Sequence, residues 1–141
     1  MKKIFTLAIA AVALAFCACS KEESVDLNQL VGKWETVKVV MSYAGQTHTE
    51  NFGEEEGQRE FFVFNEDGTG YVTDLDYYSG RWHEDTDYFS YTVNGNRVYI
   101  DNMDAQEIRI EKLTSTEMVV ALKDTEDGEN VDYKAYLIRV E

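Results

Sequence analysis

The chain has 141 residues, of which 13 are basic and 27 acidic, giving a formal net charge of −14 at pH 7. A protein this acidic is repelled by phosphate backbones and by anionic membrane surfaces, which excludes nucleic acid as a partner. The sequence contains no proline, no internal repeat and no long helical pattern, so nothing in it supports a helical or repeat architecture.

The first 18 residues have the layout of a secretory signal peptide. Met1-Lys2-Lys3 forms a short positive region, and Ile4 to Ala18 is a run of apolar and small residues interrupted by one Thr. This run of 15 residues is short for a transmembrane helix, and polar residues follow it at once. We therefore predict that residues 1–18 are a signal peptide and take no part in the fold.

The motif Phe16-Cys17-Ala18-Cys19 resembles the bacterial lipobox, in which a small residue precedes the Cys that becomes the lipidated N-terminus. Ala18 is that small residue, which makes Cys19 the predicted lipid-attachment site, whereas Cys17 follows the bulky Phe16. The resemblance implies a thioether-linked diglyceride and an N-acyl chain such as palmitate on Cys19. Several acyl chains attach a protein stably to a membrane. The alternative is a secreted protein in which Cys19 carries no lipid.

Cleavage before Cys19 would leave a mature chain of 123 residues, which by length is one domain. Because Lys2 and Lys3 leave with the signal, the mature net charge becomes −16, and no free thiol or disulfide remains. Residues 19–29 are then a lipidated tether. Within it, Ser20-Lys21-Glu22-Glu23 resembles the Lys/acid-rich tag that sends lipoproteins to the outer membrane and its outer face. The alternative is that this segment is a solvated tether and not a sorting signal.

Short alternating runs rich in Tyr, Phe, Val and Ile predict β-strands along the rest of the chain. In residues 71–77, Tyr71 and Leu75 lie on one side of the run and Asp74 lies on the other, which is the period of two that a strand requires. The predicted strands are residues 33–43, 58–65, 69–77, 79–92 (bent), 96–101, 106–113, 116–123 and 131–140.

Turn signals separate these runs. Asn65-Glu66-Asp67-Gly68 and Asn94-Gly95 are hairpin turns in which Gly or Asn accepts a positive φ, and Thr114-Ser115 and residues 124–130 are further turns. Glu50 to Gly57 contains two glycines and three consecutive glutamates, and we expect a mobile loop there. Short links between consecutive strands make every neighbouring pair antiparallel.

Eight strands with one apolar face must hide that face, either by closing into a barrel or by folding as two sheets. Both ends of the chain are predicted to be strands, which favours closure, since the first and last strands could pair. We predict an all-β fold, an eight-stranded antiparallel up-and-down barrel that follows the signal peptide.

The segment Gly32-Lys33-Trp34 resembles the Gly-x-Trp motif that opens the first strand of lipocalins, and Phe64 to Gly70 resembles a hairpin of small lipocalin-like lipoproteins. The resemblance implies a lipocalin-like barrel over residues 30–141 that holds a small apolar ligand. It also implies that Trp34 plugs the closed end of the barrel, with Arg139 stacked across its indole.

Residues typical of catalysis or metal binding are scarce. His48 and His83 are the only histidines and have no local ligand partner, so we predict no metal site. The acidic segment Asp124 to Glu129 lacks the spacing of a calcium loop. There is no nucleophile motif and no phosphate-binding loop, so we predict a non-enzymatic protein without a cofactor.

Aromatic residues are the remaining candidates for binding. The residues that we assign to inward-looking faces are Trp34, Tyr71, Leu75, Trp82, Phe89, Tyr91, Ile108, Ile110 and Val120, and the candidate ligand-binding residues among them are Trp34, Tyr71, Trp82, Phe89 and Tyr91. Eight strands enclose room either for side chains alone or for one small ligand. Two hypotheses therefore stay open: a module that binds a small apolar ligand in the barrel, and a packed barrel whose acidic exterior serves a protein partner that is not identified.

Overall fold

The computed structural model describes residues 24–101 and 107–140. The predicted signal peptide, the lipid-attachment site Cys19 and the tag Ser20–Glu23 lie outside these residues. Within them a helical turn, α3 (Leu27–Leu30), is followed by strands β2 (Gly32–Tyr43), β3 (Gln46–Asn51), β4 (Gln58–Phe64), β5 (Thr69–Tyr78), β6 (Arg81–Asn94), β7 (Arg97–Asp101), β8 (Glu107–Leu113), β9 (Glu117–Glu126) and β10 (Glu129–Arg139). No helix in this part of the chain has the length and apolarity to cross a bilayer.

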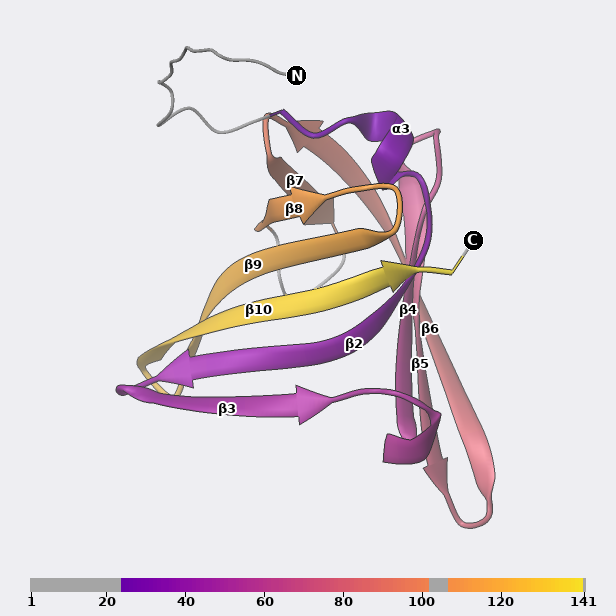
Figure 1. Ribbon diagram of the computed structural model, residues 1–141, viewed down its shortest axis with the longest axis vertical. Coiled ribbons are helices and arrows are strands. Elements are labelled where there is room, and N and C mark those ends of the chain that lie inside the picture. Colours follow the sequence, from indigo (N-terminus) through magenta and orange to yellow (C-terminus); the bar gives the residue numbers. More distant parts are fainter. Residues whose placement is uncertain (1–23, 102–106, 141) are drawn as a thin grey trace, which may run out of the picture.

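Eight of the strands form a closed antiparallel barrel, as the sequence predicted (Figure 1). Each of β4 to β9 pairs with the next strand along the chain. The barrel closes because β10 also pairs with β2, from Arg139 opposite Trp34 to Asp132 opposite Ser42. The bounds of all eight strands lie within three residues of the predicted ones.

The ninth strand, β3, pairs with β2 at the end of the barrel where β4 no longer does. β2 pairs with β4 only over Gly32–Glu35, and from Lys38 to Tyr43 the same edge of β2 pairs with β3 instead. The strands β4–β5–β6 therefore diverge from the strands β9–β10–β2–β3 at one end of the barrel (Figure 1). We call this end of the barrel the mouth.

The sequence analysis did not predict β3, and the loop expected over Glu50–Gly57 is more structured than predicted. It contains the end of β3, a bridge between Gly53 and Gln58, and a short 3-10 helix, η2 (Glu54–Glu56). The Gln58 amide donates hydrogen bonds to the Asn51 carbonyl at 2.9 Å and to the Glu50 carboxylate at 3.2 Å. These contacts fasten the segment to the start of β4.

Turns at the two ends of the barrel differ in what covers them. The turns β2–β3, β5–β6 and β9–β10 lie at the mouth, whereas α3 and the turns β4–β5, β6–β7 and β8–β9 lie at the opposite, closed end (Figure 1). Asp26 caps α3 by accepting a hydrogen bond from the Asn28 amide at 3.0 Å, and Leu30 is fully buried. α3 therefore acts as a lid on the closed end.

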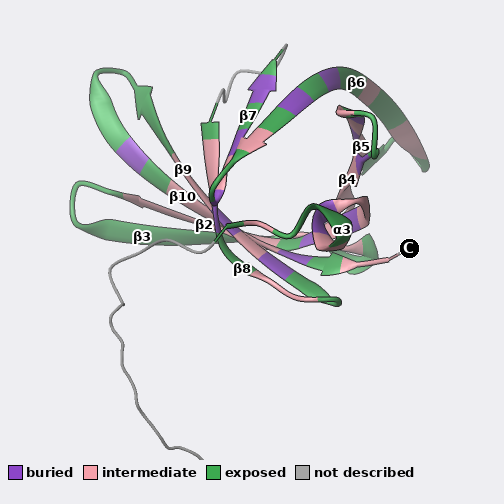
Figure 2. Cartoon of the chain, turned by 90° about the horizontal axis from the view of Figure 1, so that it is seen from above, coloured by how far each residue is buried: buried purple, intermediate pink, exposed green. Residues whose placement is uncertain are grey.

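The core fills the barrel between the lid and the mouth. Buried and exposed positions alternate from Tyr88 to Thr92 of β6 and along β7, as a half-buried strand requires (Figure 2). The rings of Phe64, Phe89 and Tyr91 pack edge to face with centroids 5.1 to 6.4 Å apart. Gly70 passes directly beneath them, where a Cβ atom would lie 2.6 Å from the Phe89 ring, so only glycine fits at this position.

Candidate functional site

The closed end of the barrel is built around Trp34. Its side chain is fully buried, and its indole N–H donates a 2.9 Å hydrogen bond to the Leu30 carbonyl of α3. The Arg139 guanidinium lies 4.3 Å from the centroid of the indole ring, which is the stacking that the lipocalin resemblance implied.

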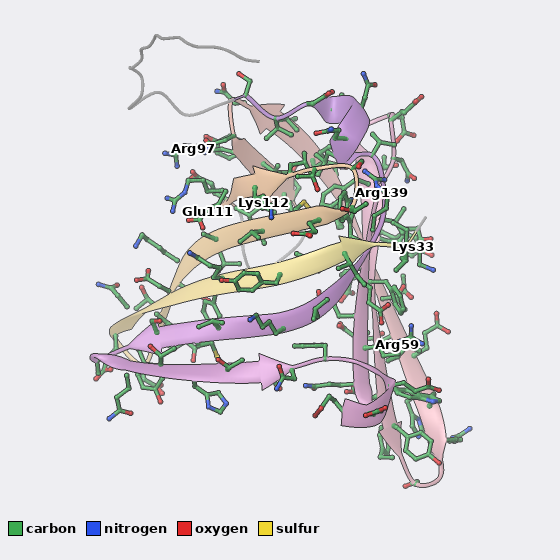
Figure 3. The ribbon with its side chains drawn as sticks, viewed as in Figure 1. Lys33, Arg59, Arg97, Glu111, Lys112 and Arg139 are labelled. Atoms are coloured by element: carbon green, nitrogen blue, oxygen red, sulfur yellow. The ribbon has the colours of Figure 1, made fainter. Side chains whose placement is uncertain are left out.

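Arg139 also binds the backbone around the lid. Its guanidinium donates hydrogen bonds to the carbonyls of Ser115 at 2.8 Å and of Val31 at 3.0 Å, and to the carbonyl of Gln29. Figure 3 shows Arg139 beneath α3, where the last strand meets the first. One side chain therefore links α3, the β8–β9 turn and the start of β2.

A cavity of about 180 Å³ lies above this packed end, toward the mouth. Most of its wall is apolar, and among the residues that the structure describes Glu60 is its only carboxylate. The lining residues are Val39, Glu60, Phe62, Phe64, Ile100, Ile108, Met118, Val120, Leu122, Tyr133, Ala135 and Leu137. An engineered apolar cavity of about 150 Å³ binds benzene, so this space is large enough for one ring or a short alkyl chain.

The residues that the sequence placed inside the barrel divide into two groups. Six of the nine are interior: Trp34, Phe89, Tyr91, Ile108, Ile110 and Val120. Of these, Ile108 and Val120 line the cavity. Trp34, Phe89 and Tyr91 belong instead to the packed core at the closed end, where the Tyr91 hydroxyl donates a 2.5 Å hydrogen bond to the Asn65 carbonyl.

The predicted interior position of Tyr71, Leu75 and Trp82 is wrong. Tyr71 and Leu75 alternate with the buried Val72 and lie on the outer face of the sheet, in a shallow depression that they share with Lys33 and Arg59. Trp82 lies on the same outer face, because it is the cross-strand partner of Tyr77, which is 51% exposed. The candidate ligand-binding residues Tyr71 and Trp82 thus point away from the barrel interior.

Glu60 lies where the packed core ends and the mouth begins. The Thr36 hydroxyl of β2 donates a 2.7 Å hydrogen bond to one of its carboxylate oxygens. Asp74, its cross-strand partner on β5, shares a hydrogen bond with the Glu60 carboxyl group. The pKa of Glu60 is raised to about 7, chiefly by burial and also by the nearby charge of Asp74, although the hydrogen bond from Thr36 lowers it. Burial, with the charge of Asp76 next, also raises the pKa of Asp74.

Ion pairs between the described residues lie on the outside of the barrel. Arg59 pairs with Glu35 at 2.8 Å on the outer face of β4 and β2, and Lys134 pairs with Glu111 at 3.0 Å on the far side. Figure 3 shows Arg97 of β7 and Glu111 and Lys112 of β8 projecting outward from the barrel. In residues 24–101 and 107–140, no ion pair joins a basic side chain to Glu60 or Asp74.

Sequence reasoning missed the cavity wall on β4. The run Gln58-Arg59-Glu60-Phe61-Phe62-Val63-Phe64 is apolar on both faces, so its composition does not reveal which side points inward. The register decides, since Phe62 lies opposite the buried Trp34. Glu60 then shares the inner face with Phe62 and Phe64, and that alternation is the signal that would have found it.

Clusters of side chains that could bind a metal ion are absent from the described residues. No group of three or more His, Cys, Asp or Glu side chains there is arranged to hold an ion. His48 and His83 lie on different strands, and the His83 ring stacks on the Tyr78 ring at 3.6 Å between centroids.

Comparisons with known proteins agree with the closed barrel. A family model described as a lipocalin-like domain matches residues 30–120. The siderocalin Ex-FABP is similar in structure, with a TM-score of 0.52 and 13% identity over 79% of this chain and 74% of that one. Bovine odorant-binding protein in complex with a selenium-containing odorant has a TM-score of 0.52 and 18% identity over 88% and 78% of the two chains. The same bovine protein with undecanal has a TM-score of 0.51 and 16% identity over 86% and 78%. Likeness at these identities shows a shared fold. A search of curated protein sequences finds no match.

Proposed function

The chain belongs to the lipocalin-like domain family, and on that basis we propose that it binds a small, mostly apolar ligand inside its barrel. The observation that carries the proposal is the apolar cavity of about 180 Å³ between the packed closed end and the open mouth. Small-molecule sites are concave, mostly apolar and provided with a few polar groups that orient the ligand. Glu60 is such a group in this wall.

We further propose that the protein is a non-enzymatic lipoprotein of the outer membrane, displayed at the cell surface through acyl chains on Cys19. Support comes from the signal-like run of residues 4–18, from Ala18 before Cys19, and from the tag Ser20–Glu23. The measurement is the mass of the mature protein recovered from cells, which should start at Cys19 and carry the acyl chains. Recovery with the leader intact would refute this proposal.

Ligand binding is tested by filling the cavity from one wall. Ala135 lines the cavity on β10, so Ala135→Leu adds three carbons to that space. Ala121, which lies outside the barrel beside Lys134, provides the matched control Ala121→Leu. We expect apolar probes of one-ring size to raise the melting temperature of the wild type and of Ala121→Leu, but not of Ala135→Leu. Absence of any shift in the wild type would remove the proposal.

A second function is favoured by a separate observation on the outer face of β5 and β6. Tyr77 and Tyr88 are 51% and 72% exposed, and aromatic side chains are enriched where proteins meet other proteins. The protein would then act as a surface interaction protein through this aromatic face. Replacing Tyr77 and Tyr88 together with Ser would abolish capture of such a partner and leave ligand-induced stabilisation unchanged.

A further inference from the structure

The inner wall of the mouth on β4, β5 and β6 carries carboxyl groups where a barrel interior is normally apolar. Strand register places Glu60 opposite Asp74, and Asp74 opposite Asp85 on β6. One row toward the closed end, Asp87 lies opposite the buried Val72, and this row joins the carboxyl groups to the core. Because alternate residues of a strand share a face, all these carboxyl groups project into the mouth.

The facing wall of the cavity is apolar. Val39 on β2, Leu122 on β9, and Ala135 on β10 line it, and Val39 and Ala135 are cross-strand partners. Tyr133 also lines it, but its hydroxyl donates a hydrogen bond to the Glu126 carboxylate, toward the β9–β10 turn. A molecule in this cavity therefore meets hydrocarbon on one side and the Glu60 carboxyl group on the other.

The charge around Glu60 is of one sign on every strand that faces it. The titratable groups around Glu60 on the inner side are Glu50 on β3, Asp74 and Asp76 on the adjacent β5, and His83, Asp85 and Asp87 on β6, while β2 contributes the neutral hydroxyl of Thr36. Within residues 24–101 and 107–140 these acids form no ion pair with a basic side chain. Glu60 and Asp74 instead share a hydrogen bond between their carboxyl groups, and burial raises the pKa of each.

We propose that the ligand of this cavity is a small amphipathic cation, whose apolar group fills the cavity and whose ammonium group binds between Glu60 and Asp74. The proposal rests on the proposed function and adds the chemical class of the ligand. An ammonium ion supplies several N–H donors and one positive charge, which are what two adjacent carboxylates lack. The cation takes the place of the proton that Glu60 holds below about pH 7, so binding at pH 6 releases that proton to solvent.

Other ligand classes fit this wall less well. A carboxylate or phosphate group would meet the six acids Glu50, Glu60, Asp74, Asp76, Asp85 and Asp87 at the mouth and would be repelled. A long acyl chain exceeds the space, because about 180 Å³ is little more than the cavity of about 150 Å³ that holds benzene. A one-ring amine such as 2-phenylethylamine matches both the volume and the charge.

The experiment is titration calorimetry with 2-phenylethylamine and with its neutral analogue 2-phenylethanol. At pH 6, in two buffers that differ in ionisation enthalpy, we expect the amine to release close to one proton and the alcohol none. At pH 8.5, where Glu60 is already ionised, the proton release should vanish and the amine should bind at least tenfold more tightly than at pH 6. Equal affinity for amine and alcohol, without proton release, would overturn the inference.

Glu60→Gln is the decisive variant, because its amide oxygen still accepts the Thr36 hydrogen bond while the charge is lost. We expect it to weaken amine binding at least tenfold at pH 8.5, to abolish proton release, and to change affinity for the alcohol less than twofold. Glu66→Gln, an exposed acid in the β4–β5 turn at the closed end, is the control that should behave as the wild type. Asp74→Asn provides the same test from the other carboxyl group.

The outcomes separate the two proposals. If the alcohol binds and the amine shows no advantage, the choice of ligand class is wrong while the apolar site stands. If neither probe binds, the proposed ligand-binding function fails together with this inference.

Discussion

At the scale of single residues, Glu60 makes stability depend on pH. Its pKa is about 7 in the folded protein against a reference value of 4.5, because burial disfavours the charged form. The folded state therefore holds a proton that the unfolded state has lost between about pH 4.5 and 7, and stability falls as the pH rises through that window. Above pH 7 the loss is complete.

We expect Glu60→Gln, which stays neutral, to escape this loss. Relative to the wild type, the variant should gain stability progressively between pH 4.5 and 7, by up to about 3 kcal/mol at pH 8. Urea unfolding at several pH values measures the difference. The lowered pKa values of Asp67 and Glu111 act in the opposite direction but are common to both proteins, so they cancel. Parallel curves for the two proteins would contradict the assignment.

Arg139 is expected to stabilise the closed end more than an ordinary surface cation does. Arg139→Ala removes the stacking on Trp34 and leaves the carbonyls of Val31 and Ser115 without their donor. We expect a loss of about 2–4 kcal/mol in the free energy of unfolding. The control is Lys123→Ala, because Lys123 is 77% exposed and its pair with Asp132 should contribute below about 1 kcal/mol. Similar losses in the two variants would show that the stacking adds nothing.

The Trp34–Arg139 contact was predictable because Trp34 lies in a Gly-x-Trp motif and the resemblance to lipocalins implies that Arg139 stacks on it. Glu60 was not, since a charged residue in an alternating run is ordinarily assigned to solvent. Its inward position follows only from the register of β4 against β2, which places Phe62 opposite Trp34. Register is a tertiary property that one strand does not encode alone.

At the scale of elements, the period of each strand was predictable but not always its phase. The apolar set Tyr71, Leu75 and Tyr77 looked like the inner face of β5, yet Val72 is buried and Asp74 faces the mouth. The rule that apolar residues point inward holds where the barrel is closed and packed. It fails where β4 to β6 leave the barrel, because both faces of that sheet are then free of the core.

β3 escaped prediction for a related reason. Its six residues, Gln46 to Asn51, are all exposed, so they show no apolar face from which a strand is identified. The strand exists because β2 continues past the point where β4 departs, and its free edge from Lys38 to Tyr43 is paired by the returning chain. Pairing of an open edge, rather than burial, forms this element.

This origin predicts low local stability for β3. Because β3 pairs with one strand only and buries no residue, its amide hydrogens should exchange on the order of 100-fold faster than those of β10, which pairs on both sides. Hydrogen–deuterium exchange with mass spectrometry, comparing peptides over residues 46–51 and 132–138, measures the ratio. Equal protection would mean that β3 belongs to the cooperative core of the barrel.

At the scale of the whole molecule, the start of the described chain and the acidic side chains lie at opposite ends of the barrel. The described chain enters at the closed end, where the Val25 amide donates a 2.8 Å hydrogen bond to the Gly95 carbonyl. The carboxyl groups of Glu60, Asp74 and Asp85 lie toward the other end, at the mouth. An acidic mouth is repelled by an anionic bilayer, which favours an orientation with the closed end toward the membrane.

The proposed anchor on Cys19 strengthens this orientation through chain length. The five Cα–Cα steps from Cys19 to Ser24 reach at most about 18 Å when fully extended. β10, which runs from the mouth to the closed end with 11 residues, is about 36 Å long. The tether is therefore too short to let the barrel invert freely, and the mouth should open into solvent away from the bilayer.

Energy transfer from the barrel to a membrane dye tests the orientation. If lipid occupies the Cys19 sulfur and Cys17 leaves with the signal, an introduced cysteine is the only free thiol of the mature protein. Ser115→Cys places a donor dye in the β8–β9 turn at the closed end, and Gln46→Cys places it at the start of β3, next to the β2–β3 turn at the mouth. In vesicles with acceptor-labelled headgroups, we expect stronger transfer from position 115 than from position 46. Equal transfer would mean that the barrel lies flat on the membrane, and the reverse order would mean that the mouth faces the bilayer and takes its ligand from there.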